Sequence, residues 1–485
     1  MTSTTDRIAP ASDTSTPSSA QRWTTRTWLL LLVVCIVIAL DGLDVSMVGV
    51  ALPSIGTELS LETGTLQWIV SAYVLGYGSL LLLGGRLADL LGRRRILLIA
   101  LGVFAVASLA GGLVSDPAIV IASRFVKGIA AAFTAPAAFS LITTNFAEGP
   151  SRNRAISIFT TFAASGFSLG LIVGGLMTSL SWRWTFLFSV PFAVAALVLG
   201  LFFIPRDRRA ENGGHDIWGA VTLAVGMLSL VYTVVSAPEV GWGSLQTILG
   251  LVGAGLVLAA FAIIELRAKH PLIRFGILRE GSVARANISA IALFGSYVSF
   301  QFILTIYLQS VLGWQPLSMA LALLPAGLVV VATAPFADRL IDRFGSPLLI
   351  TVALGALSLG YLLFLRVGTE PVYAVDILPS VLLLGAGFAL GFPAIQERAT
   401  SGISNDEQGL AAGLVQSSSQ VGAALVLAVT TALIAGGGQV AGASAGQLLD
   451  GFRPGLVLST VVALVGFAVA LAPRRRPRTA RRSLR

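Results

Sequence analysis

Four charged residues of this sequence lie inside otherwise apolar stretches: Asp41, Asp44, Arg124 and Lys127. A charge at the centre of a membrane-spanning helix costs about 2.5–3.5 kcal/mol on insertion scales, so such a group faces a cavity, meets a partner or is neutralised. Loss of solvation favours the uncharged form of a carboxyl group and so permits protonation near neutral pH. The pattern therefore points to proton or cation coupling.

Asp44 is expected to carry the coupling proton. Asp41 precedes it by one helical turn, shares its helix face and is the next candidate, because neighbouring carboxylates favour protonation of one another. The alternatives are a simple ion pair for Asp44 and a position near water for Asp41. Arg124 cannot release its own proton, so we expect it to compete electrostatically with the proton for Asp44 or to form a fixed ion pair. Lys127 is interpreted as a side chain that extends toward water.

Other kinds of chemistry lack a matching motif. The sequence has no G-x-x-x-x-G-K-[ST] phosphate loop, one cysteine (Cys35) and no nucleophile–base or His/Cys cluster. We therefore expect no enzyme activity, no cofactor and no metal. Energy would come from an ion gradient, and each proton moved through 100 mV supplies about 2.3 kcal/mol.

The composition explains where these residues must lie. Hydrophobic residues make up 55% of the chain and charged residues 11%, whereas soluble domains have about 25% charged residues. The net charge of +9 is spread in short runs between apolar segments, which argues against nucleic-acid binding. The chain is therefore predicted to be an all-α membrane protein.

The elements that position the charges are apolar runs long enough to span a bilayer, which takes about 20 residues. Cytoplasmic connectors are enriched in Lys and Arg. With both termini in the cytoplasm, 27 of the 32 basic residues fall on the inner side and three on the outer side. Fourteen spans are predicted: 29–52, 66–84, 96–114, 117–140, 155–179, 185–204, 217–236, 245–266, 286–311, 318–336, 347–365, 372–395, 407–435 and 454–472.

An internal repeat divides these spans. Gly85–Arg95 follows the second span, and a related stretch, Phe336–Gly345, follows the tenth. Two six-helix halves separated by a helical hairpin explain this spacing, as in transporters built from repeats. The predicted parts are a disordered tail (1–26), an N-terminal half (27–204), a linker with two extra helices (205–284), a C-terminal half (285–472) and a basic tail (473–485).

Several motifs resemble those of the major facilitator superfamily, specifically its fourteen-span drug:proton antiporter family. They are Leu43–Pro53 around Asp44, Gly85–Arg95, Arg124–Gly128 with Lys127 in place of the usual glutamine, Trp182–Trp184 and Tyr307–Gln309. The resemblance runs from about residue 28 to residue 472. It implies alternating access between two halves, with Asp44 and Arg124 in proton coupling.

The fifth span carries the antiporter motif of this family with one change. The motif glycines are present, but Leu171 replaces its proline, so the glycine face remains while the built-in kink is lost. Symport therefore stays open beside antiport. The glycines expected to let helices approach closely are Gly166, Gly170, Gly174 and Gly175.

The stretch after the second span resembles the superfamily's conformational latch. Asp89 would interact with a helix N-terminus near Ser404, and Arg93 with an acid such as Asp406 or Glu148. Topology-setting positive charge is the simpler alternative. The residues assigned to the latch are Asp89, Arg93, Arg94, Gly85 and Gly92.

Polar residues within the spans are candidates for lining the substrate cavity. Interhelical hydrogen bonding, worth about 0.6 kcal/mol per bond, is the alternative role. The candidates are Gln67, Tyr73, Gln301, Gln309, Gln416 and Gln420.

The sequence as a whole indicates a monomeric, multi-pass transporter of a bacterial inner (cell) membrane that exports small hydrophobic or amphipathic compounds, such as drugs, antibiotics or secondary metabolites, by proton antiport. The second interpretation is a proton-coupled transporter of a dedicated metabolite or lipid, with symport as one of its forms. A transport-inactive sensor is disfavoured by the charged residues and the glycine pattern.

Overall fold

The computed structural model describes residues 23–147, 150–206, 217–268, 281–401, 403, 405–436 and 444–472, and nearly all of them are helical. The two predicted tails, at 1–26 and 473–485, lie largely or wholly outside these residues. The first seven helices, here called the N-terminal half, are α1 (Thr25–Glu58), α2 (Thr63–Leu91), α3 (Arg93–Leu113), α4 (Pro117–Asn145), α5 (Pro150–Leu180), α6 (Arg183–Leu187) and α7 (Ser189–Phe203).

Two helices follow, α8 (Ile217–Val240) and α9 (Leu245–Arg267). The remaining elements, here called the C-terminal half, are α11 (Gly281–Ile306), η1 (Tyr307–Val311), α12 (Pro316–Thr333), η2 (Ala334–Phe336), α13 (Ala337–Phe344), α14 (Ser346–Phe364), η3 (Tyr373–Ile377), α15 (Leu378–Thr400), α16 (Asn405–Gly436) and α17 (Ala445–Leu471).

Local sequence signals set several helix starts. Asp116 precedes α4, and its side chain accepts hydrogen bonds from the backbone N–H groups of Ala118 (2.8 Å) and Ile119 (3.3 Å). Ser444 forms a capping box with Gln447 at the start of α17. These caps satisfy backbone donors that have no partner within the helix.

Twelve helical stretches among the described residues are long and apolar enough to cross a membrane. The prediction of an all-helical, multi-pass membrane protein is therefore confirmed. Helices α2 and α5, with 29 and 31 residues, are not among the twelve. The predicted count of fourteen spans stays a prediction.

The predicted loop after the second span is mostly helical. Helix α2 continues through Gly85 to Leu91, and Gly92, with φ of 101°, separates it from α3. Gly345, with φ of 76°, separates α13 from α14 in the same way. Glycine adopts positive φ without a steric cost, so both related stretches end in a sharp helix-to-helix turn.

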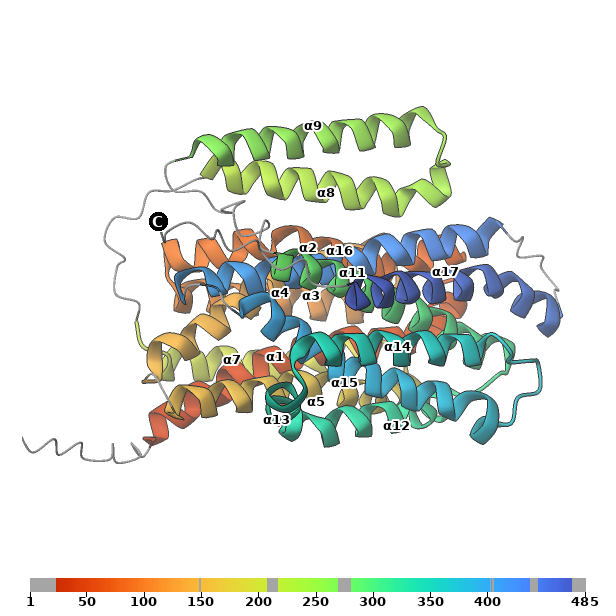
Figure 1. Cartoon of the computed structure of the whole chain (residues 1–485), viewed down its shortest axis with the longest axis horizontal. Coiled ribbons are helices and arrows are strands. Elements are labelled where there is room, and N and C mark those ends of the chain that lie inside the picture. Colours follow the sequence, from red (N-terminus) through yellow and green to blue (C-terminus); the bar gives the residue numbers. More distant parts are fainter. Residues whose placement is uncertain are drawn as a thin grey trace, which may run out of the picture.

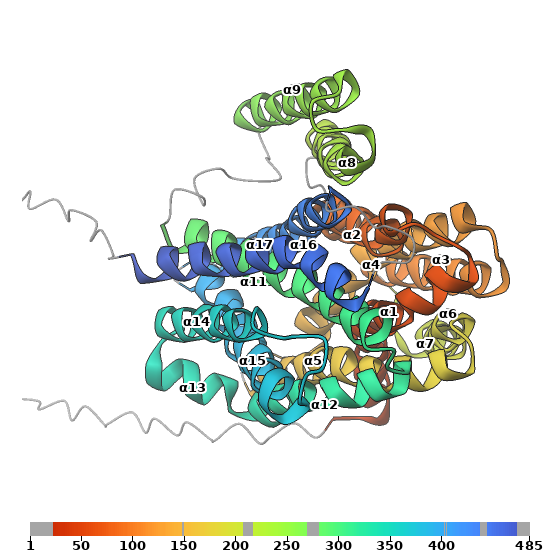
Figure 2. The ribbon, with the colours of Figure 1, turned by 90° about the vertical axis from the view of Figure 1, so that its right-hand side faces the viewer.

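Helices α8 and α9 form a pair beside the main bundle, as the upper part of Figure 1 and Figure 2 shows. Helix α8 packs against α2 of the N-terminal half and α16 of the C-terminal half. Its buried residues Val231, Val234 and Val235 join the apolar cluster that includes Tyr73 and Ala424. Helix α8 therefore covers part of the seam between the two halves.

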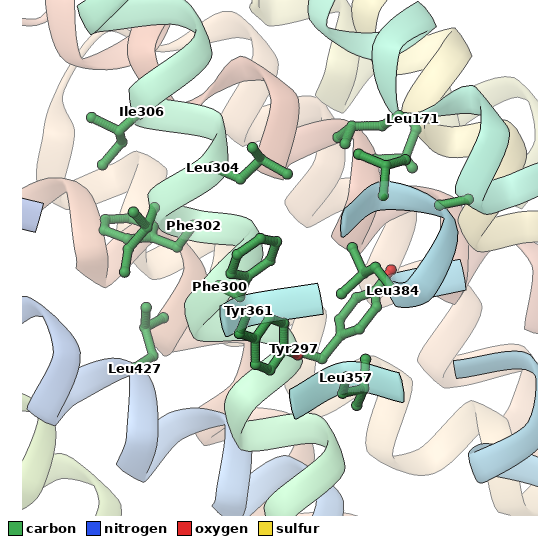
Figure 3. Packing of buried hydrophobic residues seen from close by; sticks show 14 of the residues in the cluster. Leu171, Tyr297, Phe300, Phe302, Leu304, Ile306, Leu357, Tyr361, Leu384 and Leu427 are labelled. Atoms are coloured by element: carbon green, nitrogen blue, oxygen red, sulfur yellow. The ribbon is translucent and has the colours of Figure 1, made fainter. Parts of the chain in front are cut away.

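A large apolar core joins the two halves. It contains Val50 and Ile55 of α1 together with Phe300 of α11. Figure 3 shows part of this cluster, where Phe300 lies beside Tyr361, with ring centroids 4.5 Å apart. Burial of this apolar area stabilises the contact between the two halves.

Candidate functional site

The centre of the site is Asp44 of α1. Its Oδ2 pairs with the guanidinium of Arg124, and its Oδ1 pairs with the ammonium of Lys127, both from α4. All three side chains are buried, at 0%, 1% and 0% exposure for Asp44, Arg124 and Lys127. Two cations therefore share one carboxylate in the interior of the bundle.

Arg124 is also held by groups other than Asp44. Its Nε donates to the carbonyl oxygen of Ile69 in α2, at 3.0 Å. Its guanidinium lies over the ring of Tyr73, 4.5 Å from the centroid. Tyr73, predicted to line a cavity, thus belongs to the charged cluster, where its ring stabilises the cation.

Lys127 differs from its sequence interpretation. Its side chain does not extend to water, because it is fully buried and bound to Asp44. Its Nζ lies 4.7 Å from the ring centroid of Phe104 in α3 and 5.2 Å from that of Phe186 in α6. The ammonium of Lys127 thus contacts two aromatic rings and the Asp44 carboxylate in place of water. The spacing of three residues from Arg124 was the signal for a shared face.

Asp41 lies one turn before Asp44 and is 7% exposed. Its Oδ2 is buried and has no hydrogen-bond partner. Nor does Asp41 take part in any ion pair of the described residues, in contrast with the doubly paired Asp44. The two acids predicted to act together thus have different surroundings.

The glycine face of α5 brings α1 close. A Cβ built on Gly166 would lie 2.9 Å from the Cα of Ala39, one on Gly170 2.9 Å from the Cα of Leu43, and one on Gly174 2.7 Å from the Cα of Met47. Three glycines four residues apart thus meet three α1 residues four residues apart. Gly175 faces the other half: its Cβ would lie 2.5 Å from the Cβ of Ala320 in α12. Leu171 is buried in the large apolar core.

Several predicted cavity residues lie at the seam between the two halves. Thr431 of α16 donates to the Oε1 of Gln67 of α2. The Nε2 of Gln309 donates to the carbonyl oxygen of Val50 at 2.8 Å. These bonds join α1 and α2 of one half to η1 and α16 of the other.

The remaining three glutamines are also near the seam. A Cβ on Gly49 of α1 would lie 3.9 Å from the Nε2 of Gln301, and one on Gly78 of α2 2.8 Å from the Cβ of Gln420. Gln416 accepts a hydrogen bond from Gln396 at 3.4 Å. Gln67, Gln309 and Gln416 thus hydrogen-bond to other helices, and the assignment of the six residues to a substrate cavity stays a prediction.

Only part of the predicted latch falls on described side chains. The side chain of Asp89 and the residues Glu148, Ser404 and Asp406 lie outside them. Arg93 donates to the carbonyl oxygen of Ser140 (3.4 Å), and Arg94 to that of Leu201 (2.7 Å), both within the N-terminal half. Gly85 and Gly92 lie in and after the last turns of α2.

A network around Glu58 was missed by the sequence interpretation. The indole Nε1 of Trp182 donates to the Oε2 of Glu58 at 2.9 Å, and the guanidinium of Arg183 pairs with the other oxygen of Glu58. Arg183 also donates to the hydroxyl of Ser115 at 2.7 Å. The Trp182–Trp184 motif was the available signal, but its acidic partner lies 124 residues earlier.

The chain is similar to proteins of known name. The chain is 36% identical over 457 residues to "Puromycin resistance protein pur8" of Streptomyces alboniger, with 92% of this chain and 88% of that protein covered. It is 36% identical over 405 residues to "Cephamycin export protein CmcT" of Amycolatopsis lactamdurans, with 82% and 83% covered. The relatives are thus proteins of antibiotic resistance and export.

The fold matches that of solved transporters. The POT family transporter PepTSo has a TM-score of 0.67 at 18% identity, with 93% of this chain and 98% of that chain covered. A point mutant of the nucleoside transporter NupG has a TM-score of 0.65 at 13% identity, with 92% and 99% covered. Residues 34–427 match the family model described as Major Facilitator Superfamily. This chain is therefore a transporter, not an enzyme, and belongs to the Major Facilitator Superfamily.

Proposed function

We propose that this transporter exports small hydrophobic or amphipathic compounds of the antibiotic type in exchange for protons. The observation that carries the proposal is the buried cluster of Asp41, Asp44, Arg124 and Lys127 between α1 and α4. Two buried acids beside two buried cations form a unit whose charge changes with one proton. The names of the two relatives, which refer to puromycin resistance and cephamycin export, support antibiotics as the substrate class.

Exchange rather than symport is supported by the glycine face of α5. Gly166, Gly170 and Gly174 let α5 lie against the backbone of α1, the helix that carries both acids. A movement of α5 against α1 would therefore change the surroundings of Asp41 and Asp44 directly. Leu171 stands where the antiporter motif has proline, and α5 is a continuous helix through it.

Transport of puromycin by the purified protein tests the proposal. In proteoliposomes with an imposed proton gradient, acid inside, puromycin from outside should accumulate, and an uncoupler should abolish the accumulation. Accumulation driven only by the opposite gradient would show symport. No puromycin movement under either gradient, together with none of a cephamycin, would contradict the proposed substrate class.

For the topology we propose fourteen spans, with α2 and α5 crossing the membrane in addition to the twelve apolar helices. Both termini would lie in the cytoplasm of a bacterial cell. The working unit would be a monomer. Helices of 29 and 31 residues extend about 43 and 46 Å at 1.5 Å per residue, which exceeds the roughly 30 Å hydrocarbon core. The α8–α9 pair would be inserted between the two six-helix halves.

Cysteine labelling tests these crossings, because Cys35 is the single cysteine and is buried. In a Cys35→Ser background, Glu62→Cys should react with a membrane-impermeant maleimide on intact cells. Arg95→Cys, beyond the other end of α2, should react only after the membrane is opened. For α5, the same contrast is expected between Ser179→Cys, in the last turn of α5, and Thr144→Cys, in the last turn of α4 just before α5 begins. If both cysteines of a pair were labelled on intact cells, the corresponding helix would not cross the membrane.

A further inference from the structure

Asp44 is a poor site for an exchangeable proton in this chain. Both of its carboxylate oxygens are occupied, one by Arg124 and one by Lys127. Charge-assisted hydrogen bonds of this kind are about twice as strong as neutral ones. Protonation of Asp44 would break both ion pairs and leave two buried cations without a directly paired anion, which is the unfavourable arrangement for buried charge.

If Asp44 were protonated, Arg124 and Lys127 could not move to new partners without breaking further contacts. Arg124 is bound to the Ile69 carbonyl and lies over Tyr73, while Lys127 lies between Phe104 and Phe186. Lys127 is the second cation that the family motif, with glutamine at this place, would lack. This residue therefore makes Asp44 a fixed counter-ion.

Asp41 has the opposite surroundings. Its Oδ2 is buried without a hydrogen-bond partner, and the residue is 7% exposed whereas Asp44 is 0% exposed. The Thr134 hydroxyl of α4 faces Asp41 within hydrogen-bonding reach and also donates to the carbonyl oxygen of Ala131 at 3.2 Å. Among the described residues Asp41 thus has a neutral hydroxyl beside it and forms no ion pair, whereas Asp44 forms two.

We propose that Asp41 binds and releases the transported proton, while Lys127 and Arg124 together hold Asp44 as a permanent carboxylate. In the binding step an O–H bond forms on the Asp41 carboxylate with a proton from water; in release that bond breaks. The four-residue cluster is neutral when Asp41 is ionised and carries +1 when Asp41 is protonated. The proposal rests on the proton coupling proposed above and identifies its site.

Other titratable groups near Asp41 do not replace it. Tyr77 of α2 lies near both Asp41 and Gln416 of α16, so a charge change at Asp41 acts close to a contact between the halves. The arginines of α5 and α6 are remote from the middle of α1, since those of α5 lie in its first two turns and that of α6 is bound to Glu58. Helices α7 and α12 contain no charged residue. The remaining groups near Asp41 on packed helices are Asp44, Tyr73, Arg124 and Lys127. Helix α11 carries Tyr297 and Arg285, and Arg285 donates to the carbonyl oxygen of Ala472.

Infrared difference spectroscopy of the purified protein tests the assignment without any substrate. The pH is lowered from 9 to 6, a range in which exposed carboxylates stay ionised because their pKa is about 4. Wild-type protein should then gain an infrared band of a protonated carboxyl group. Asp41→Asn should lose that band completely. Asp450→Asn, which removes an exposed carboxylate paired with Arg453, should keep it. A band that persists in Asp41→Asn would overturn the proposal.

The role of Lys127 has its own readout. Lys127→Gln leaves Asp44 with Arg124 alone, so a second carboxyl band should appear, and it should vanish again in Lys127→Gln/Asp44→Asn. A spectrum of Lys127→Gln equal to that of wild type would contradict the fixed counter-ion. Failure of wild-type protein to transport puromycin would overturn the proposed function but would leave these band assignments unchanged, so the two failures are distinguishable.

Discussion

At the scale of the residue, the main feature is a carboxylate shared by two cations. Asp44, Arg124 and Lys127 form this arrangement entirely out of contact with solvent. Replacing a buried ion pair with apolar groups is often harmless, whereas removing one partner is strongly destabilising. The cluster should therefore respond far more to loss of its anion than to loss of one cation.

Asp44→Asn should lower stability by about 3–5 kcal/mol, because it leaves two buried cations without their directly paired anion. Thermal unfolding in detergent measures the loss. Lys127→Gln/Asp44→Asn should recover part of it, since only one cation then lacks its anion. The exposed pair of Asp450 and Arg453 supplies the control, and Asp450→Asn should cost less than about 1 kcal/mol. Equal melting temperatures for Asp44→Asn and wild type would contradict this account of the cluster.

At the scale of the element, contact between α5 and α1 depends on glycine. A Cβ on Gly170 would lie 2.9 Å from the Cα of Leu43 and would collide with the hydroxyl of Ser46. Gly170→Ala should therefore push the helices apart, with a cost of about 1–3 kcal/mol and reduced puromycin transport.

Gly102→Ala in α3 is the matched control, because a Cβ there meets nothing within 4 Å. It should be neutral or stabilising by up to about 1 kcal/mol through helix propensity. Melting temperature and transport rate of the two variants, measured side by side, check the prediction. Similar behaviour of both would mean that α5 does not need this close approach.

The α8–α9 pair should be dispensable for proton coupling. It packs on α2 and α16 from outside and contains none of the cluster residues. Deletion of residues 217–267 should lower stability, because the apolar surface under Val231 and Val235 would be exposed, but exchange of puromycin for protons should persist. A folded, inserted deletion protein without exchange would assign the pair a part in coupling.

At the scale of the whole molecule, the halves are joined at the ends of α2 and α16 that lie outside in the proposed topology. Gln67 and Thr431 hydrogen-bond there, 364 residues apart. Alternating access requires this contact to open. In a Cys35→Ser background, a short thiol cross-linker between Gln67→Cys and Thr431→Cys should stop puromycin transport, and reduction should restore it.

A cross-link inside one half is the control for that experiment. Asn287 of α11 and Ser418 of α16 are hydrogen-bonded at 2.7 Å within the C-terminal half. Because a rigid half moves as a unit, linking Asn287→Cys to Ser418→Cys should leave transport largely intact. Unchanged transport after complete linking of the Gln67 and Thr431 positions would show that the halves do not separate there.

The sequence alone determined the class of this protein. Its apolar runs, sparse charges and basic connectors predicted an all-helical membrane transporter, since a bilayer imposes span length and backbone satisfaction on any chain that crosses it. The motifs around Asp44, Arg124 and the α5 glycines pointed to the superfamily to which the chain belongs. These properties are local in sequence, so they can be read without a fold.

The tertiary structure decided which groups meet. Helical spacing places Lys127 on the face of Arg124 but does not give its depth, which depends on Phe104 and Phe186 from two other helices. Likewise, Asp41 and Asp44 share a helix face, yet the packing of α4 against α1 brings Arg124 and Lys127 into ion pairs with Asp44 and not with Asp41. No periodic pattern in the sequence links partners that lie tens or hundreds of residues apart. Only the packing of the helices brings them within bonding distance.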